Sequence, residues 1–129
     1  YLGNLSSKRD WGYAGDYVEG MWKIIQHSKA NDFVLATGKS YSVRDFLREA
    51  FRCININIIF KKKNSKEVGI DSKTKKIIVN SIPYYYRPNE VTNLVGDYSK
   101  AKKLLKWKPK TNFKELVKMM VESDIKECS

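Results

Sequence analysis

The 129-residue chain has few residues that bind metals or form disulfides: two cysteines, Cys53 and Cys128, and one histidine, His27. The cysteines do not form a Cys-x-x-Cys pair, whereas a structural zinc site needs about four Cys or His ligands. We therefore expect no metal site, no disulfide framework and no Cys–His catalytic pair. Such sparse cysteine is typical of a reducing compartment, so we expect a cytoplasmic protein.

Long apolar runs and glycine-rich loops are also lacking. No run approaches the roughly 20 apolar residues of a membrane-spanning helix, and residues 1–9 do not have the order of a signal peptide. The sequence has no Gly-x-Gly, which excludes the glycine-rich loop that binds dinucleotides. We expect no membrane contact and no cofactor-binding residue in this chain. The first residue is Tyr1, not Met, which favours a fragment.

Acidic residues are scarce relative to basic ones, with 14 Asp and Glu against 25 Lys and Arg and a net charge of +11. A basic module could bind nucleic acid by releasing counterions from phosphates. The alternative is a lysine-rich surface exposed to solvent. The lysines are spread over several expected helices and one loop, so we favour the second interpretation and expect no nucleic-acid partner.

The apolar pattern alternates between helical and strand spacing, which predicts an α/β fold. Expected helices begin near Gly15, Ser42, Ser99 and Asn112, and expected strands cover 33–38, 54–60 and 76–79; residues 61–66 form a polar loop. In the first helix, 15–28, Val18, Met21, Trp22 and Ile25 share one face and should be inward. Trp22 and Trp107 are both expected to pack in the core.

Two helix starts carry a capping signature. Ser42 with Asp45, and Asn112 with Glu115, have the three-residue spacing in which each side chain caps the other's backbone N–H. In the last helix, the apolar positions that follow Asn112 are expected to face the core; these are Phe113, Leu116, Val117, Met120 and Val121.

Two arginines stand in distinctive settings, Arg9 in Lys-Arg-Asp-Trp-Gly and Arg87 in Arg-Pro-Asn-Glu-Val. The planar guanidinium donates two parallel hydrogen bonds to phosphate oxygens, so two such residues suit a diphosphate. Glu90 could orient Arg87 or accept hydrogen bonds from sugar hydroxyls. The alternatives are surface pairs, Arg9 with Asp10 or Asp16 and Arg87 with Glu90.

Arg44 lies at the start of the second expected helix. It could contact a phosphate in the positive field of the helix N-terminus, brace the sheet, or be a surface charge. We include it, after Arg9, Arg87 and Glu90, among the candidate substrate-binding residues.

A series of short motifs resembles one family. In order they are Leu2-Gly3-Asn4-Leu5, Arg9-Asp10-Trp11-Gly12, Asp16-Tyr17-Val18, Ala36-Thr37-Gly38, Ser42-Val43-Arg44, Arg87-Pro88-Asn89-Glu90-Val91 and Trp107-Lys108-Pro109. Together, over essentially all of residues 1–129, they resemble the C-terminal part of the GDP-mannose 4,6-dehydratases, which are extended short-chain dehydrogenase/reductases. The resemblance implies one C-terminal nucleotide-sugar-binding part without most of the Rossmann domain.

The resemblance also implies a reaction. The family's enzymes hold NADP in an N-terminal Rossmann domain and convert GDP-mannose to GDP-4-dehydro-6-deoxy-mannose, a precursor of GDP-fucose, by oxidation at C4, loss of water across C5 and C6, and return of the hydride to C6. Arg9 and Arg87 match the arginines that hold the diphosphate, and Glu90 matches the glutamate of the Arg-Pro-x-Glu motif. Homodimers or homotetramers are expected for the whole enzyme.

The sequence departs from the family's pattern at Tyr13, Asn89 and Lys106, where His, Thr or Ala, and Gly are usual. The resemblance places the catalytic tyrosine, lysine and glutamate upstream, so we expect no catalytic residue and no activity from this chain alone. Alternatives are another nucleotide-sugar epimerase or dehydratase, a basic nucleic-acid-binding module, or a remnant without a ligand.

Overall fold

The computed structural model describes residues 1–63, 66–87, 89 and 91–128. Its elements in chain order are β1 (Lys8–Arg9), α1 (Ala14–Ile25), β2 (Tyr41–Ser42), α2 (Val43–Cys53), β3 (Ile58–Lys63), β4 (Lys66–Asp71), β5 (Ile77–Asn80), the 3-10 turn η1 (Pro83–Tyr85), α3 (Ser99–Leu105) and α4 (Phe113–Cys128). β1 pairs with β2, and β3, β4 and β5 form a sheet in that order; these strands pair antiparallel. The fold is mixed α/β, as expected.

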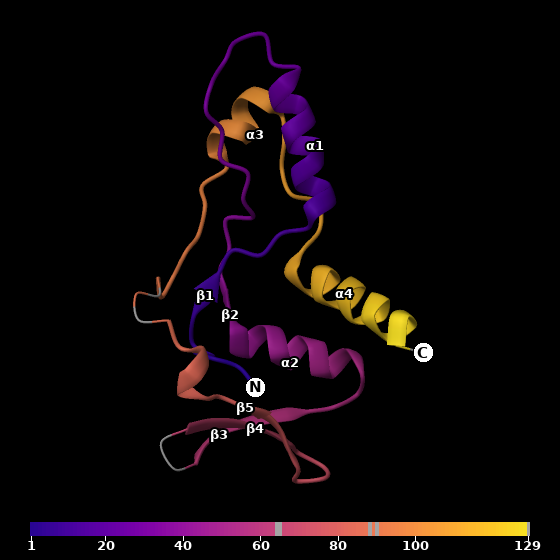
Figure 1. Cartoon of the computed structure of the whole chain (residues 1–129). Helices are drawn as coiled ribbons and strands as arrows, with labels where there is room; N and C mark the ends of the chain where they lie inside the picture. Colours follow the sequence, from indigo (N-terminus) through magenta and orange to yellow (C-terminus); the bar gives the residue numbers. More distant parts are fainter. Residues whose placement is uncertain (64–65, 88, 90, 129) are drawn as a thin grey trace.

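Helix α2 lies across the three-stranded sheet, as Figure 1 shows. Leu5, Ile58 and Val79 form the buried cluster beneath it, and Leu47 and Phe51 of the helix pack on that cluster. Such burial stabilises by about 25 cal/mol for each Å² of apolar surface removed from water. The helix begins where the sequence predicted.

The capping box at the start of α2 is confirmed. The Ser42 hydroxyl accepts the Asp45 N–H at 3.1 Å, and the Asp45 carboxylate accepts the Ser42 N–H at 3.0 Å. The second predicted box is also present, because Asn112 Oδ1 accepts the Glu115 N–H and Glu115 Oε2 accepts the Asn112 N–H. These boxes fix the first turns of the two helices on either side of the aromatic contact described next.

Helix α4 is joined to the rest of the chain by aromatic contacts. The Phe113 ring stacks on Tyr41 with 3.9 Å between centroids, and Trp11 lies 5.9 Å from Phe113. Leu116 and Val117 are buried, as expected, whereas Met120 is 45% exposed and does not belong to the inner face.

Helices α1 and α3 pack around Trp107, which confirms the buried position expected for this side chain. Trp107 is 1% exposed, and its indole N–H donates to the Asp16 carbonyl oxygen at 2.8 Å. The rings of Tyr17 and Tyr98 lie about 6 Å from it. Gly20 allows this packing, since a Cβ there would lie 3.0 Å from the indole nitrogen.

The predicted inner face of α1 is wrong. Val18, Met21, Trp22 and Ile25 are 62, 56, 63 and 74% exposed, so Trp22 is not a core residue. The helix turns a different face inward, with Asp16 and Gly20 buried. Helical spacing identifies an apolar stripe but not the surface that covers it. We call these four residues the exposed α1 stripe.

Three other elements predicted from the sequence differ from those in the structure. Residues 33–38 contain no strand, because no described strand pairs with them. The strand expected over 54–60 begins only at Ile58, since the chain turns at Asn55, which has a left-handed φ of 60°. The expected loop at 61–66 is the end of a hairpin between β3 and β4, with residues 64 and 65 outside the described part.

Candidate functional site

Arg9 lies on the two-stranded sheet, where Arg9 pairs with Tyr41. One terminal nitrogen of its guanidinium, Nη1, donates to the Lys8 carbonyl oxygen and to the Val91 carbonyl oxygen, both at 2.7 Å. Val91 is 82 residues away in sequence. The side chain is therefore held in one direction by the segment that follows the second candidate arginine.

That segment, residues 91–96, runs along β1. The Lys8 N–H donates to the Thr92 carbonyl oxygen at 2.9 Å, and the Leu94 N–H donates to the Lys8 carbonyl oxygen at 3.3 Å. Lys8 and Asn93 form a parallel bridge. The structure thus brings two distant motifs together through their main chains.

Asp10 fixes the far end of this segment. Its carboxylate accepts hydrogen bonds from the Thr37 N–H at 2.9 Å, the Thr37 hydroxyl at 2.5 Å, the Gly38 N–H at 3.0 Å and the Gly96 N–H at 3.1 Å. Sequence reasoning missed this role, because the partners lie 27 to 86 residues away and only the position beside Arg9 gives a hint.

A second carboxylate, Asp16, joins α1 to the approach to α4. It is buried, and Oδ2 accepts the N–H groups of Lys110 and Thr111, both at 2.9 Å. These bonds lie apart from the 91–96 segment. Asp16 therefore has the same chemistry as Asp10 with different partners.

Arg87 is exposed and follows the 3-10 turn. It lines an open cavity of about 410 Å³ with residues 1–3 and three tyrosines, Tyr84, Tyr85 and Tyr86. Val91 is the fourth residue after it, so the Cα atoms of these two residues are at most about 14 Å apart. Glu90 and Pro88 lie outside the described residues.

Arg44 braces helix α2 to strand β4. Its Nε and Nη2 donate to the two carboxylate oxygens of Glu67 at 2.7 and 2.9 Å, and Nη2 also donates to the Ser6 hydroxyl at 3.0 Å. The hydrogen bonds that the guanidinium donates to Glu67 raise the pKa of Arg44. Of the roles considered for this residue, bracing the sheet is the one its contacts form.

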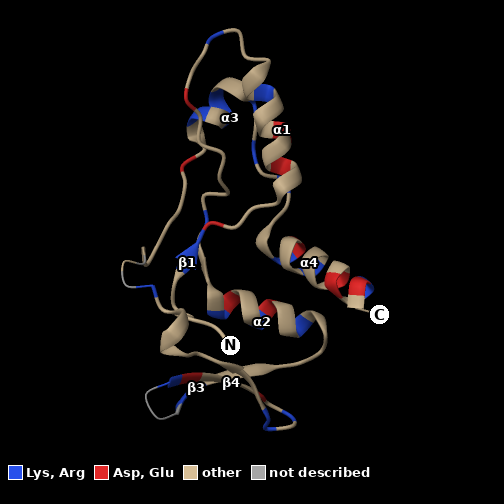
Figure 2. Cartoon of the chain, viewed as in Figure 1, with Lys and Arg blue, Asp and Glu red and all other residues tan. Residues whose placement is uncertain are grey.

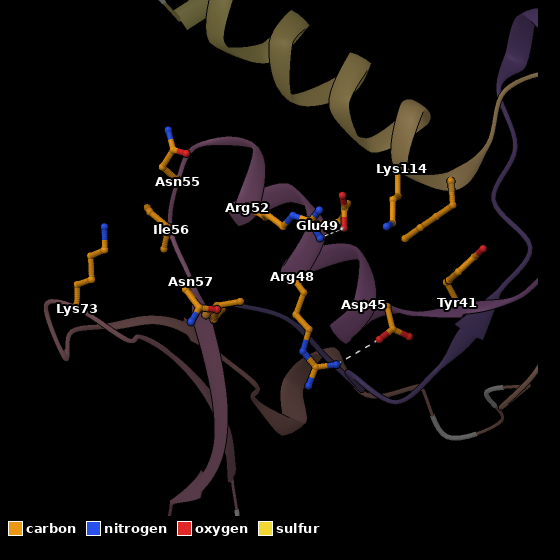
Figure 3. A pocket seen from close by; sticks show the side chains of 12 residues that line it. Tyr41, Asp45, Arg48, Glu49, Arg52, Asn55, Ile56, Asn57, Lys73 and Lys114 are labelled. Carbon is orange, nitrogen blue, oxygen red and sulfur yellow. Dashed lines mark hydrogen bonds and ion pairs between the residues drawn. The ribbon is translucent and has the colours of Figure 1, made fainter.

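A cavity of about 780 Å³ lies between α2 and α4 (Figure 3). Arg9, Arg44 and Arg87 do not line it. Its wall carries Arg48 and Arg52, which pair with Asp45 and Glu49 of the same helix at 3.3 and 3.6 Å. The two arginines of the wall are therefore paired with carboxylates of their own helix.

Basic residues are spread over the molecule. Figure 2 shows Lys and Arg on the sheet, on the loops and on helices, with acidic residues among them on α1, α2 and α4. In the described part, no group of three or more metal-ligating side chains is found, and no helix is long and apolar enough to cross a membrane. Both cysteines are free and exposed.

Tyr98 and Lys102 have the Tyr-x-x-x-Lys spacing of a short-chain dehydrogenase pair, although no catalytic residue is expected in this chain. The Tyr98 ring lies edge-on to Trp107 with 6.0 Å between centroids, and its carbonyl oxygen accepts the Lys102 N–H. The pair forms the start of α3. Without a glycine-rich loop in the sequence, the residues present do not fit a nicotinamide dinucleotide.

The fold defines a class of proteins. A UDP-glucose 4-epimerase from Thermotoga maritima, solved with UDP-glucose, superposes with a TM-score of 0.73 at 22% identity, over 100% of this chain and 35% of its own. RMD from Pseudomonas aeruginosa, solved with NADPH, superposes with a TM-score of 0.69 at 13% identity. The match covers 99% of this chain and 35% of RMD. The chain has the fold of the C-terminal part of these enzymes.

The family model for GDP-mannose 4,6 dehydratase matches residues 1–120. The chain therefore belongs to the GDP-mannose 4,6 dehydratase family. The relative from Dictyostelium discoideum, which bears that name, is 52% identical over 97% of this chain and 35% of its own length. The human relative of the same name is 49% identical over 96% of this chain and 33% of its own length. The chain spans about a third of the length of these relatives.

Proposed function

We propose that this chain is the GDP-sugar-holding part of a GDP-mannose 4,6-dehydratase, a cytoplasmic lyase that converts GDP-mannose to GDP-4-dehydro-6-deoxy-mannose. In the whole enzyme, a homodimer or homotetramer, an N-terminal part would hold NADP and the reacting groups. NADP when bound would supply the hydride chemistry, and this chain would bind and orient the diphosphate.

The observation that carries the proposal is the hydrogen bond from Arg9 to the Val91 carbonyl oxygen. It places one guanidinium beside the segment that begins four residues after the other arginine. Two guanidinium groups suit the two phosphates of GDP, because each can make paired charge-assisted hydrogen bonds with one phosphate. Glu90 and Arg44 remain weaker proposals, Arg44 because its guanidinium already binds Glu67.

We further propose that the chain alone is inactive. Its exposed α1 stripe is a contiguous apolar face of a kind that soluble proteins normally cover. Residues 33–37 belong to no helix or strand and pair with no described strand. In the whole enzyme, both would pack against the N-terminal part.

The first test is calorimetric titration of the folded chain with GDP, with UDP and dTDP as competitors. We expect GDP to bind, and Arg87→Ala to weaken binding about tenfold or more, since a hydrogen bond to a charged group contributes roughly 1.5–3 kcal/mol. Arg52→Ala is the matched control: it removes an arginine whose side chain is 70% exposed on α2. Equal losses in both variants would contradict the proposal.

The second test measures activity. The chain replaces the C-terminal part of the Dictyostelium relative, and dehydratase turnover of the chimeric enzyme is compared with that of the isolated chain. Turnover by the chimera and none by the chain is expected. Turnover by the isolated chain would refute the inactivity proposal, and preference of the chimera for UDP- or dTDP-sugars would favour another nucleotide-sugar enzyme.

The alternative of a basic nucleic-acid-binding module can be distinguished from a GDP-sugar-binding part by the salt dependence of binding. Such a module binds generic duplex with an affinity that falls steeply with salt and does not respond to GDP. We expect GDP to bind and duplex not to compete with it.

A further inference from the structure

We infer that Asp10 is a positioning residue for the diphosphate site, because its carboxylate fastens the 91–96 segment, whose Val91 carbonyl oxygen accepts a hydrogen bond from Arg9. The inference rests on the proposed function and assigns a role to a residue that would not touch the ligand. Asp10 acts through Arg9.

The 91–96 segment is held at three places along β1. At its start, Arg9 donates to the Val91 carbonyl oxygen. In its middle, the main chain of Lys8 bonds to Thr92 and Leu94. At its end, Asp10 accepts the Gly96 N–H at 3.1 Å. Only the last of these uses a carboxylate, which accepts several donors at once.

The same carboxylate holds the neighbouring turn. Oδ1 takes both donors of Thr37, and Oδ2 takes the N–H groups of Gly38 and Gly96. The 91–96 segment passes this turn closely, since a Cβ at Gly96 would lie 2.4 Å from the Ala36 Cβ. Asp10 thus fixes the position of residue 96 relative to β1 and to residues 36–38.

An alanine at position 10 removes both acceptor oxygens. The N–H groups of Thr37, Gly38 and Gly96 then lose the carboxylate that joins them. The end of the segment is released, and the Val91 carbonyl oxygen that holds Arg9 is less firmly positioned.

Asp16 provides a matched control. It also accepts two backbone N–H groups at 2.9 Å and is more buried than Asp10, but its partners are Lys110 and Thr111. Asp16→Ala therefore tests a comparable loss of carboxylate bonding without release of the 91–96 segment.

The experiment titrates GDP into the chain and measures KM and kcat for GDP-mannose in the chimeric enzyme, for Asp10→Ala, Asp16→Ala, Arg9→Ala and Arg87→Ala. We expect Asp10→Ala to weaken GDP binding about tenfold and to raise KM more than it lowers kcat. Asp16→Ala should lower the Tm but change GDP affinity less than twofold. In an Arg9→Ala background, Asp10→Ala should have little further effect, since Asp10 acts through Arg9.

Equal weakening by Asp10→Ala and Asp16→Ala, or full additivity of Asp10→Ala with Arg9→Ala, would overturn the inference and leave Asp10 a general structural residue. Unchanged GDP binding in Asp10→Ala, with loss in Arg87→Ala, would also overturn it while the proposed function stands. No loss in Arg87→Ala would instead refute the proposed function. Where Asp10→Ala does not fold, Asp10→Glu, which keeps the charge and moves it by one methylene, is measured with the same expectation.

Discussion

Replacing Arg44 by alanine distinguishes two roles for this residue: an ion pair that holds α2 against β4, and a contact with the phosphate groups of a ligand. The guanidinium makes a two-pronged ion pair with Glu67, and the two side chains are 25 and 22% exposed. An exposed ion pair contributes about 0–1 kcal/mol, and a hydrogen bond to a charged group contributes roughly 1.5–3 kcal/mol when shielded. For this partly exposed pair, we expect a coupling energy of about 1–2 kcal/mol.

The net loss of stability is smaller than the coupling. Arg44 lies in the first turn of α2, where a positive charge opposes the helix dipole by about 0.3–1 kcal/mol, and its removal relieves that opposition. Arg44→Ala should therefore lower the free energy of unfolding by about 1 kcal/mol. The substitution also leaves the Glu67 carboxylate without the Arg44 guanidinium that it pairs with.

The assay is urea unfolding of Arg44→Ala, Glu67→Gln and the double variant, with GDP titration of each. A brace predicts a coupling of about 1–2 kcal/mol and unchanged GDP affinity in all three. A coupling near zero refutes the reasoning from geometry. Weaker GDP binding in Arg44→Ala but not in Glu67→Gln would instead assign Arg44 to the phosphate site.

Three further predictions concern the fold. Trp107→Phe should lower the free energy of unfolding by about 2 kcal/mol in denaturant titration, because the buried Asp16 carbonyl oxygen loses its donor; a change within 0.5 kcal/mol, the typical range for a surface substitution, would contradict this. Ser42→Ala removes the α2 cap and should cost about 1 kcal/mol, and an unchanged denaturation midpoint would argue against the capping box. Burial alone would raise the pKa of Asp45, but hydrogen bonds from Ser42 and the nearby arginines outweigh it and lower that pKa. The stability that Asp45 contributes is therefore present above its unfolded pKa and lost as the pH falls through its folded pKa, so Asp45→Asn should flatten the acid limb of Tm against pH; an unchanged limb would refute this.

The sequence by itself determined features that depend on neighbouring residues. The starts of α2 and α4 follow from Ser42 and Asn112, whose side chains cap backbone groups three residues away. The alternation of helices and strands predicted the α/β class. The motifs around Arg9 and Arg87 predict a phosphate-binding role, which the GDP titration tests.

Only the tertiary structure decided which surfaces meet. The exposed α1 stripe has the same helical period as a core face, and residues 33–38 have the composition of a buried strand, but each needs a partner from elsewhere to become one. In the sequence nothing distinguishes Asp10 from an ordinary surface aspartate, but in the structure its carboxylate accepts a hydrogen bond from the Gly96 N–H, 86 residues away. Local sequence fixes interactions over one helical turn, whereas burial, strand pairing and the approach of Arg9 to Val91 depend on contacts between residues far apart in the chain.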